Sequence, residues 1–139
     1  MSEKQAPWKN KYEAEIAKTS VSFDAGDNLT TEKKSDEVSI PANISLHPYN
    51  LFVIEVEKPV EDTAGDMTLS IYNRSKIDGT NIRDILHSTH TVEKITGSAT
   101  YRDFIVQGLF SGSENKIKIG CKFATDSGAI EVKCRVCRL

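Results

Sequence analysis

Long apolar runs are missing from this sequence. The longest, LFVI at residues 51–54, is far shorter than the roughly 20 residues that cross a bilayer. The start, MSEKQAPWKNKYEAEI, holds no apolar segment of the length that a signal peptide needs. Cysteine is also scarce, and an odd count of three does not fit the disulfide framework of a small secreted domain. These absences predict a soluble protein that is kept in the cytoplasm and has no contact with a membrane.

The sequence also has no large excess of charge of one sign. Lys and Arg number 18 against 20 Asp and Glu, and a net charge of −2 gives no indication of nucleic acid as a partner. The segment GLFSGSENK lacks the spacing and the Lys-Ser/Thr ending of a P-loop, and no Gly-x-Ser-x-Gly nucleophile elbow occurs. The acidic run EVEKPVEDTAGD lacks the ligand spacing of an EF-hand and is interpreted as a solvated edge. The sequence therefore predicts no catalytic residues, no cofactor and no enzymatic activity.

Alternation of apolar and polar residues is the strongest positive signal. In NKIKIGCKF the residues Ile117, Ile119 and Cys121 share one face, while lysines occupy the other. AIEVKCRVCRL repeats this period of two. Because ATDSGA between them is rich in turn-forming residues, the two strands are predicted to form one hairpin.

Further strands are predicted upstream, in segments rich in β-branched and aromatic residues and separated by Gly, Pro, Asn, Asp or Ser. They are TSVSFDAG, EVSIP, LFVIEVEK, DMTLSIYN, DILHSTHTVEKI and TYRDFIVQGLF. About eight short strands favour an all-β fold, an antiparallel β-sandwich of jelly-roll type. The length of 139 residues fits one such domain, predicted over residues 17–139. Residues 1–16 are predicted to form a short arm, with helix and strand both open.

The three cysteines do not have the arrangement of a metal or redox site. A hairpin that turns on Ser127 and Gly128 would put Cys121 opposite Cys134 on the inward face. Cys137 would then lie on the other face, roughly 10 Å from Cys134, so that the CxxC pair does not form half of a zinc site. Cys121 and Cys134 are interpreted as buried small hydrophobes, with a cross-strand disulfide as the alternative, and Cys137 as accessible.

The three histidines offer no clear ligand set. His87 and His90, in HSTH, are three residues apart and face opposite sides of a straight strand. A bend or a bulge would be needed to bring them together. His47 precedes a proline and has no recognisable partner. All three are interpreted as ordinary positions, and no metal site is predicted.

Two segments, LFVIEV and FIVQGLF, are apolar on both faces. Leu51, Val53, Ile105 and Leu109 project from the side that should meet water in a sandwich. We therefore predict self-association through this face as a homo-oligomer, a dimer or trimer, with a larger protein assembly as a further expectation. Cover by loops or by the N-terminal arm is the alternative.

The small size, the polar arm and the Gly-rich VQGLFSGSEN turn before the last two strands resemble the small accessory proteins that decorate phage capsids. The resemblance concerns size and architecture and assigns a role to no individual residue. It implies a jelly-roll fold and a virion-associated location.

The leading hypothesis from the sequence is a non-enzymatic structural or interaction protein that self-associates through one face of a β-sandwich. The alternative is a carbohydrate- or peptide-binding module that uses loops at one end of the sandwich. Aromatic residues are few, with one Trp, four Tyr and five Phe. Because the phenylalanines are assigned to the core, Tyr49, Tyr72 and Tyr101 are the candidate ligand contacts.

Overall fold

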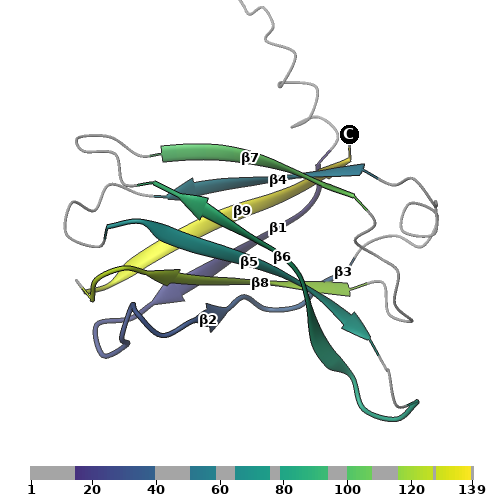
Figure 1. Ribbon diagram of the computed structural model, residues 1–139, viewed down its shortest axis with the longest axis horizontal. Helices are drawn as coiled ribbons and strands as arrows, with labels where there is room; N and C mark the ends of the chain where they lie inside the picture. The colour runs from purple at the N-terminus through teal and green to yellow at the C-terminus, as the bar shows by residue number, and fades with distance from the viewer. Residues whose placement is uncertain are drawn as a thin grey trace, which may run out of the picture.

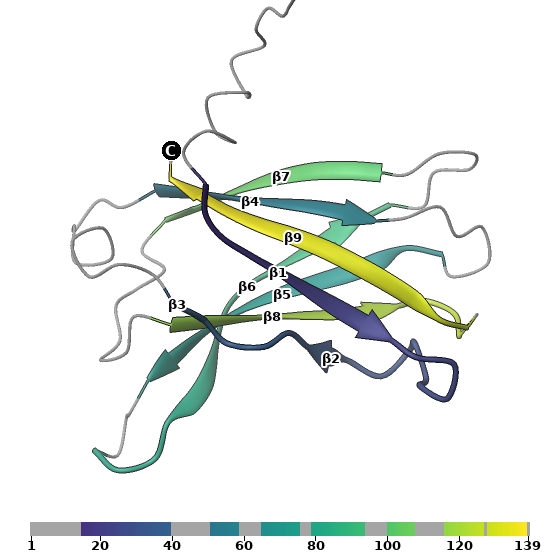
Figure 2. The same cartoon turned by 180° about the vertical axis from the view of Figure 1, so that it is seen from behind.

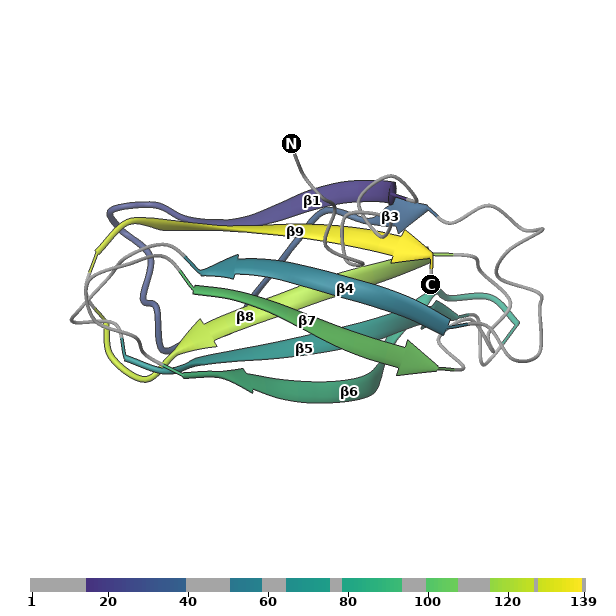
Figure 3. The ribbon, with the colours of Figure 1, turned by 90° about the horizontal axis from the view of Figure 1, so that it is seen from above.

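The computed structural model describes residues 15–39, 51–58, 65–75, 79–93, 100–107, 116–126 and 128–138. Within these ranges the chain forms nine strands and no helix, in two antiparallel sheets that pack face to face (Figures 1 and 3). The predicted all-β sandwich is confirmed. The strands are β1 (Glu15–Phe23), β2 (Lys33–Lys34), β3 (Val38–Ser39), β4 (Leu51–Lys58), β5 (Met67–Ser75), β6 (Arg83–Val92), β7 (Thr100–Gln107), β8 (Lys116–Phe123) and β9 (Ile130–Arg138). No helix in the described ranges has the length and apolar character that crossing a membrane requires.

Sheet A has the strand order β1-β9-β4-β7, and sheet B has the order β2-β8-β5-β6, with β3 also paired to β8. Sheet B faces the viewer in Figure 1, and sheet A faces the viewer in Figure 2, where β1 and β9 lie in front. Strands far apart in the sequence are neighbours in both sheets. In sheet A, for example, β1 and β9, the first and last strands of the sequence, pair along most of their length.

The period of two explains which side chains form the core. On β9 the inward positions Ile130, Val132, Cys134 and Val136 are buried, while Lys133 between them is exposed. The inward residues of the two sheets form a single cluster of apolar side chains. Burying an aliphatic or aromatic side chain of this kind contributes about 1.5–3 kcal/mol. The core therefore lies between the sheets, and most charged residues lie on the outer faces, with the buried Lys58 as an exception.

The predicted hairpin between the last two strands is wrong. β8 belongs to sheet B, where Cys121 pairs with Leu69, and β9 belongs to sheet A, where Cys134 pairs with Val56. The connection between them therefore crosses from one sheet to the other. Both cysteines point inward as predicted. A strand buries the same side chains whether it is joined to the previous strand by a hairpin or by a connection that crosses to the other sheet.

β1 begins at Glu15, so residues 15 and 16 of the predicted N-terminal arm belong to this strand. Those two residues extend an edge strand of sheet A, and residues 1–14 lie outside the described ranges.

Candidate functional site

The outer face of sheet A carries charged side chains in rows that cross three strands. Lys133 and Arg135 project outward from β9, the second strand of the sheet, between β1 and β4. On the β4 side each of these cations has a glutamate as its register partner. The two rows run Lys18–Arg135–Glu55 and Ser20–Lys133–Glu57. The cationic donors on β9 therefore lie directly beside the carboxylate acceptors on β4.

These rows line a groove of about 720 Å³ on the face turned toward the viewer in Figure 2. Three cationic and five acidic side chains border it, so acidic groups are in excess. Asp36 and Glu37, between β2 and β3, add a wall beyond the edge strand β1. The lining residues are Lys18, Thr19, Ser20, Asp36, Glu37, Glu55, Glu57, Glu131, Lys133, Cys134 and Arg135.

Arg135 is held between two carboxylates. Its Nε lies 3.4 Å from Oε1 of Glu55 and 3.6 Å from Oε1 of Glu15. Glu55 is buried, with 8% of its surface exposed, and its pairing with Arg135 offsets part of the cost of burying that charge. Lys18 extends the cluster, with its Nζ 3.8 Å from Oε2 of Glu15. The base of the groove is therefore a set of ion pairs whose positions are fixed by strand register.

Glu37, which borders the groove beyond β1, contacts two cationic side chains of sheet B. Arg74 Nη1 donates to Oε2 of Glu37, and Lys116 Nζ lies 3.2 Å from its other carboxylate oxygen. The hydrogen bond with Arg74 has the larger effect and the contact with Lys116 the smaller, and together they hold the pKa of Glu37 below its usual range. Arg74 also donates from Nε to Asp84 at 2.9 Å. Glu37 therefore remains ionised at neutral pH and has a fixed position.

The residues predicted for an oligomer interface differ in exposure: Val53 is buried and Ile105 is exposed. Val53 and Ile105 are paired on the outer face of sheet A, and Val53 is also the register partner of Cys137. Val53 and Cys137 are 2% and 0% exposed, whereas Ile105 is 64% exposed. The predicted accessibility of Cys137 is therefore wrong, because it lies against an apolar neighbour on β4. The side chain of Leu51 and the whole of Leu109 lie outside the described residues.

Of the tyrosines predicted as ligand contacts, Tyr72 lies on the outer face of sheet B, away from the groove. Its hydroxyl is 2.7 Å from both carboxylate oxygens of Glu32, and Lys34 Nζ lies 4.1 Å from its ring centroid. Burial, together with the contact with Glu32, raises the pKa of Tyr72 to about 12. Tyr101 pairs with Glu57 on the strand next to the groove, but its side chain, like all of Tyr49, is outside the described residues.

Cys121, Cys134 and Cys137 are all buried free thiols. Burial raises the pKa of Cys134 to about 12 and that of Cys137 to about 11, and it raises the pKa of Cys121 well above its usual range. Cys121 pairs with Leu69 in sheet B and Cys134 pairs with Val56 in sheet A, so the two cysteines are not cross-strand neighbours and do not form the cross-strand disulfide given as the alternative. Among the described residues, no group of three or more His, Cys, Asp or Glu side chains could hold a metal ion.

The groove was not predicted from the sequence, although parts of it were visible there. Glu55 and Glu57 share one face of a strand, and Lys133 and Arg135 share one face of another. Nothing local indicates that β4 and β9 are neighbours. The pairing of these strands, more than 70 residues apart, creates the rows.

No family model and no curated protein matches the sequence. Among solved structures, this chain is similar to a family 16 carbohydrate-binding module, with 9% identity, 81% of this chain and 72% of that chain covered, and a TM-score of 0.44. It is similar to the K1 cleaved adhesin domain of Lys-gingipain from Porphyromonas gingivalis, with 16% identity, 80% and 64% covered, and a TM-score of 0.45. A third match is to the structure of tomato aspermy virus, with 13% identity, 100% and 82% covered, and a TM-score of 0.30.

These matches are distant and concern the β-sandwich fold. The resemblance to proteins that decorate phage capsids stays a prediction, because no sequence family is identified.

Proposed function

We propose that this protein is a non-enzymatic binding module that holds an oligosaccharide in the groove on the outer face of sheet A. The observation that carries the proposal is that Lys133 and Arg135 on β9 lie beside their register partners Glu57 and Glu55 on β4 in the groove. A sugar hydroxyl donates one hydrogen bond and accepts others at the same time. Carboxylates accept, and ammonium and guanidinium groups donate, so adjacent groups of both kinds suit a chain of hydroxyls.

The size of the groove supports a ligand of several sugar units. Ligand sites commonly measure roughly 300–1,000 Å³, and this groove has about 720 Å³. The groove lies on a sheet face, whereas the sequence predicted a site on loops at one end of the sandwich. Because strands are more rigid than loops, the charged groups are held ready for a ligand and lose little freedom when it binds.

The sign of the charge narrows the ligand class. Acidic groups outnumber cationic ones around the groove, so a polyanion such as nucleic acid or a sulfated glycan would be repelled. The described lining residues include no aromatic side chain. We therefore propose a neutral oligosaccharide that is recognised by hydrogen bonds more than by ring stacking.

Replacing Lys133 by alanine is expected to weaken binding of a neutral oligosaccharide about tenfold, because a charged hydrogen bond contributes roughly 1.5–3 kcal/mol. A panel of neutral, acidic and sulfated oligosaccharides would identify the ligand, and titration calorimetry would measure its affinity. Lys122→Ala is the matched control, since Lys122 is an exposed lysine on sheet B. Equal affinities of Lys133→Ala and the unchanged protein would contradict the proposal, as would binding restricted to polyanions.

A second function, self-association, has one specific observation in its favour. Ile105 is a large apolar side chain with 64% of its surface exposed, on β7 at the free edge of sheet A. Exposed apolar residues at a free sheet edge favour contact with a second copy of the chain. In this version the protein forms a dimer or trimer through the face around Ile105.

Replacing Ile105 by lysine is expected to convert such an oligomer to monomers. Light scattering after size exclusion, over a range of concentrations, would measure the mass. Ile85→Lys is the control, because Ile85 is an exposed isoleucine on the other sheet. A monomeric unchanged protein at every concentration would exclude self-association.

A further inference from the structure

β6 contains a bulge at the HSTH segment. On the neighbouring strand β5, Ile71 pairs with Ser88 and Tyr72 pairs with Leu86, so His87 is an extra residue in β6. A bulge bends its strand and changes the direction of the side chains around it. On a straight strand His87 and His90 would face opposite sides, and a bulge at His87 is what can bring the two side chains together.

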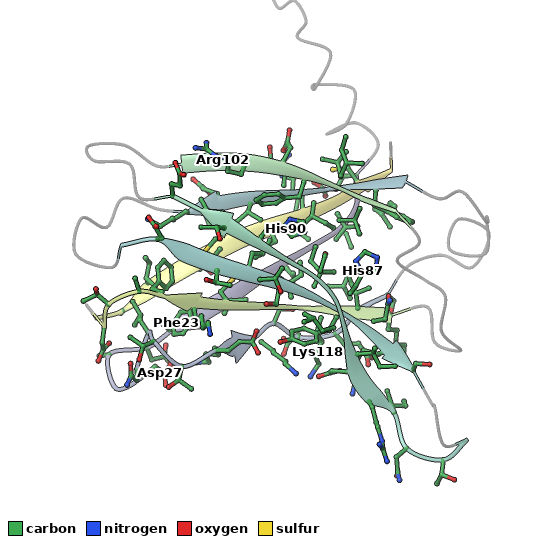
Figure 4. All side chains as sticks on the ribbon, viewed as in Figure 1. Phe23, Asp27, His87, His90, Arg102 and Lys118 are labelled. Atoms are coloured by element: carbon green, nitrogen blue, oxygen red, sulfur yellow. The ribbon has the colours of Figure 1, made fainter. Side chains whose placement is uncertain are left out.

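The two imidazole rings converge on one atom. Nδ1 of His87 lies 3.1 Å from Oγ of Ser88, and Nε2 of His90 lies 3.0 Å from the same oxygen. A hydroxyl can donate to one ring nitrogen and accept from the other. Both histidines therefore direct a ring nitrogen to the same point, and Figure 4 shows their side chains along β6.

His90 is held in position by the opposite sheet. Its ring stacks on Phe104 of β7, with centroids 4.4 Å apart and an interplanar angle of 29°. This contact fixes the plane of the ring, and with it the direction of Nε2 toward Ser88.

We propose that His87 and His90 bind a divalent transition metal ion of the zinc and copper class at the point where their nitrogens now meet Ser88 Oγ. Imidazole nitrogen is a preferred ligand of these ions, at about 2.0–2.1 Å. Since both nitrogens already lie about 3 Å from a common point, each needs to move by about 1 Å as the Ser88 hydroxyl turns aside. Solvent supplies the remaining ligands, which leaves the ion exchangeable.

The test uses the full chain without a polyhistidine tag. Zinc titrated by calorimetry near neutral pH is expected to bind at one site, and His87→Ala and His90→Ala are each expected to weaken binding by about tenfold or more. His47→Ala, which removes the third histidine, is the control and is expected to leave the affinity unchanged. Ser88→Ala is also expected to retain binding, because the hydroxyl is displaced.

Electron paramagnetic resonance of the copper-loaded protein provides a second readout. The unchanged protein is expected to show coupling of Cu²⁺ to imidazole nitrogens, and His87→Ala to lose part of it. His87 is the more informative position if His90→Ala disturbs the packing on Phe104. Absence of zinc binding would overturn the proposal, and so would undiminished affinity in His87→Ala or an equal loss in His47→Ala. The site is separate from the groove, so neither result depends on oligosaccharide binding.

Discussion

Replacing Ile54 by alanine is expected to lower the free energy of unfolding by about 2–5 kcal/mol. Ile54 is completely buried on the central strand β4 and is the register partner of Phe104 and Val136. The loss combines the transfer free energy of the deleted groups with the cavity that the surrounding strands cannot fill. For a domain with a total stability of about 5–15 kcal/mol, this is a large fraction. Urea unfolding followed by circular dichroism would measure it.

Ile105→Ala provides the matched control, because it deletes the same atoms from the next strand of the same sheet. Ile105 is 64% exposed, so its replacement is expected to change the free energy of unfolding by less than about 0.5 kcal/mol. Similar losses at both positions would mean that the inward and outward faces of sheet A are wrongly assigned.

The second large effect is expected from alkaline pH. The usual pKa of a cysteine thiol is about 9, and burial raises that of Cys134 to about 12 and that of Cys121 well above its usual range. Above about pH 9 the unfolded chain loses these protons while the folded chain keeps them, so stability present below that pH is lost as the pH rises. Between about pH 7.5 and pH 10 the loss is expected to be about 1 kcal/mol per buried thiol.

Urea unfolding with a reductant present, at neutral and alkaline pH, would measure this loss. Between neutral and alkaline pH, the free energy of unfolding of Cys134→Ala is expected to fall by about 1 kcal/mol less than that of the unchanged protein. Val132→Ala is the control, because it opens a cavity at the neighbouring inward position of β9 without removing an ionisable group. Its stability should be lower at both pH values with an undiminished difference between them. An unchanged pH dependence in Cys134→Ala would show that this thiol ionises equally in both states.

The functional surfaces depend on arrangements that the sequence does not encode locally. Lys133 and Arg135 are recognisable as outward residues of a strand, but their meeting with Glu55 and Glu57 requires β4 and β9 to be neighbours. Tyr72 was predicted as a ligand contact, but its hydroxyl contacts Glu32 and its ring contacts Lys34, because the segment around β2 pairs with β8.

The alternation of apolar and polar residues by itself determined the all-β fold, most strand positions and the inward direction of residues such as Cys121 and Cys134. This is because side chains on a strand alternate between faces whatever the strand pairs with. The tertiary structure decided which sheet each strand joins, and hence the groove, because a hairpin and a crossing between sheets bury the same face. It also decided the convergence of His87 and His90, since the extra residue of a bulge is defined only against the partner strand.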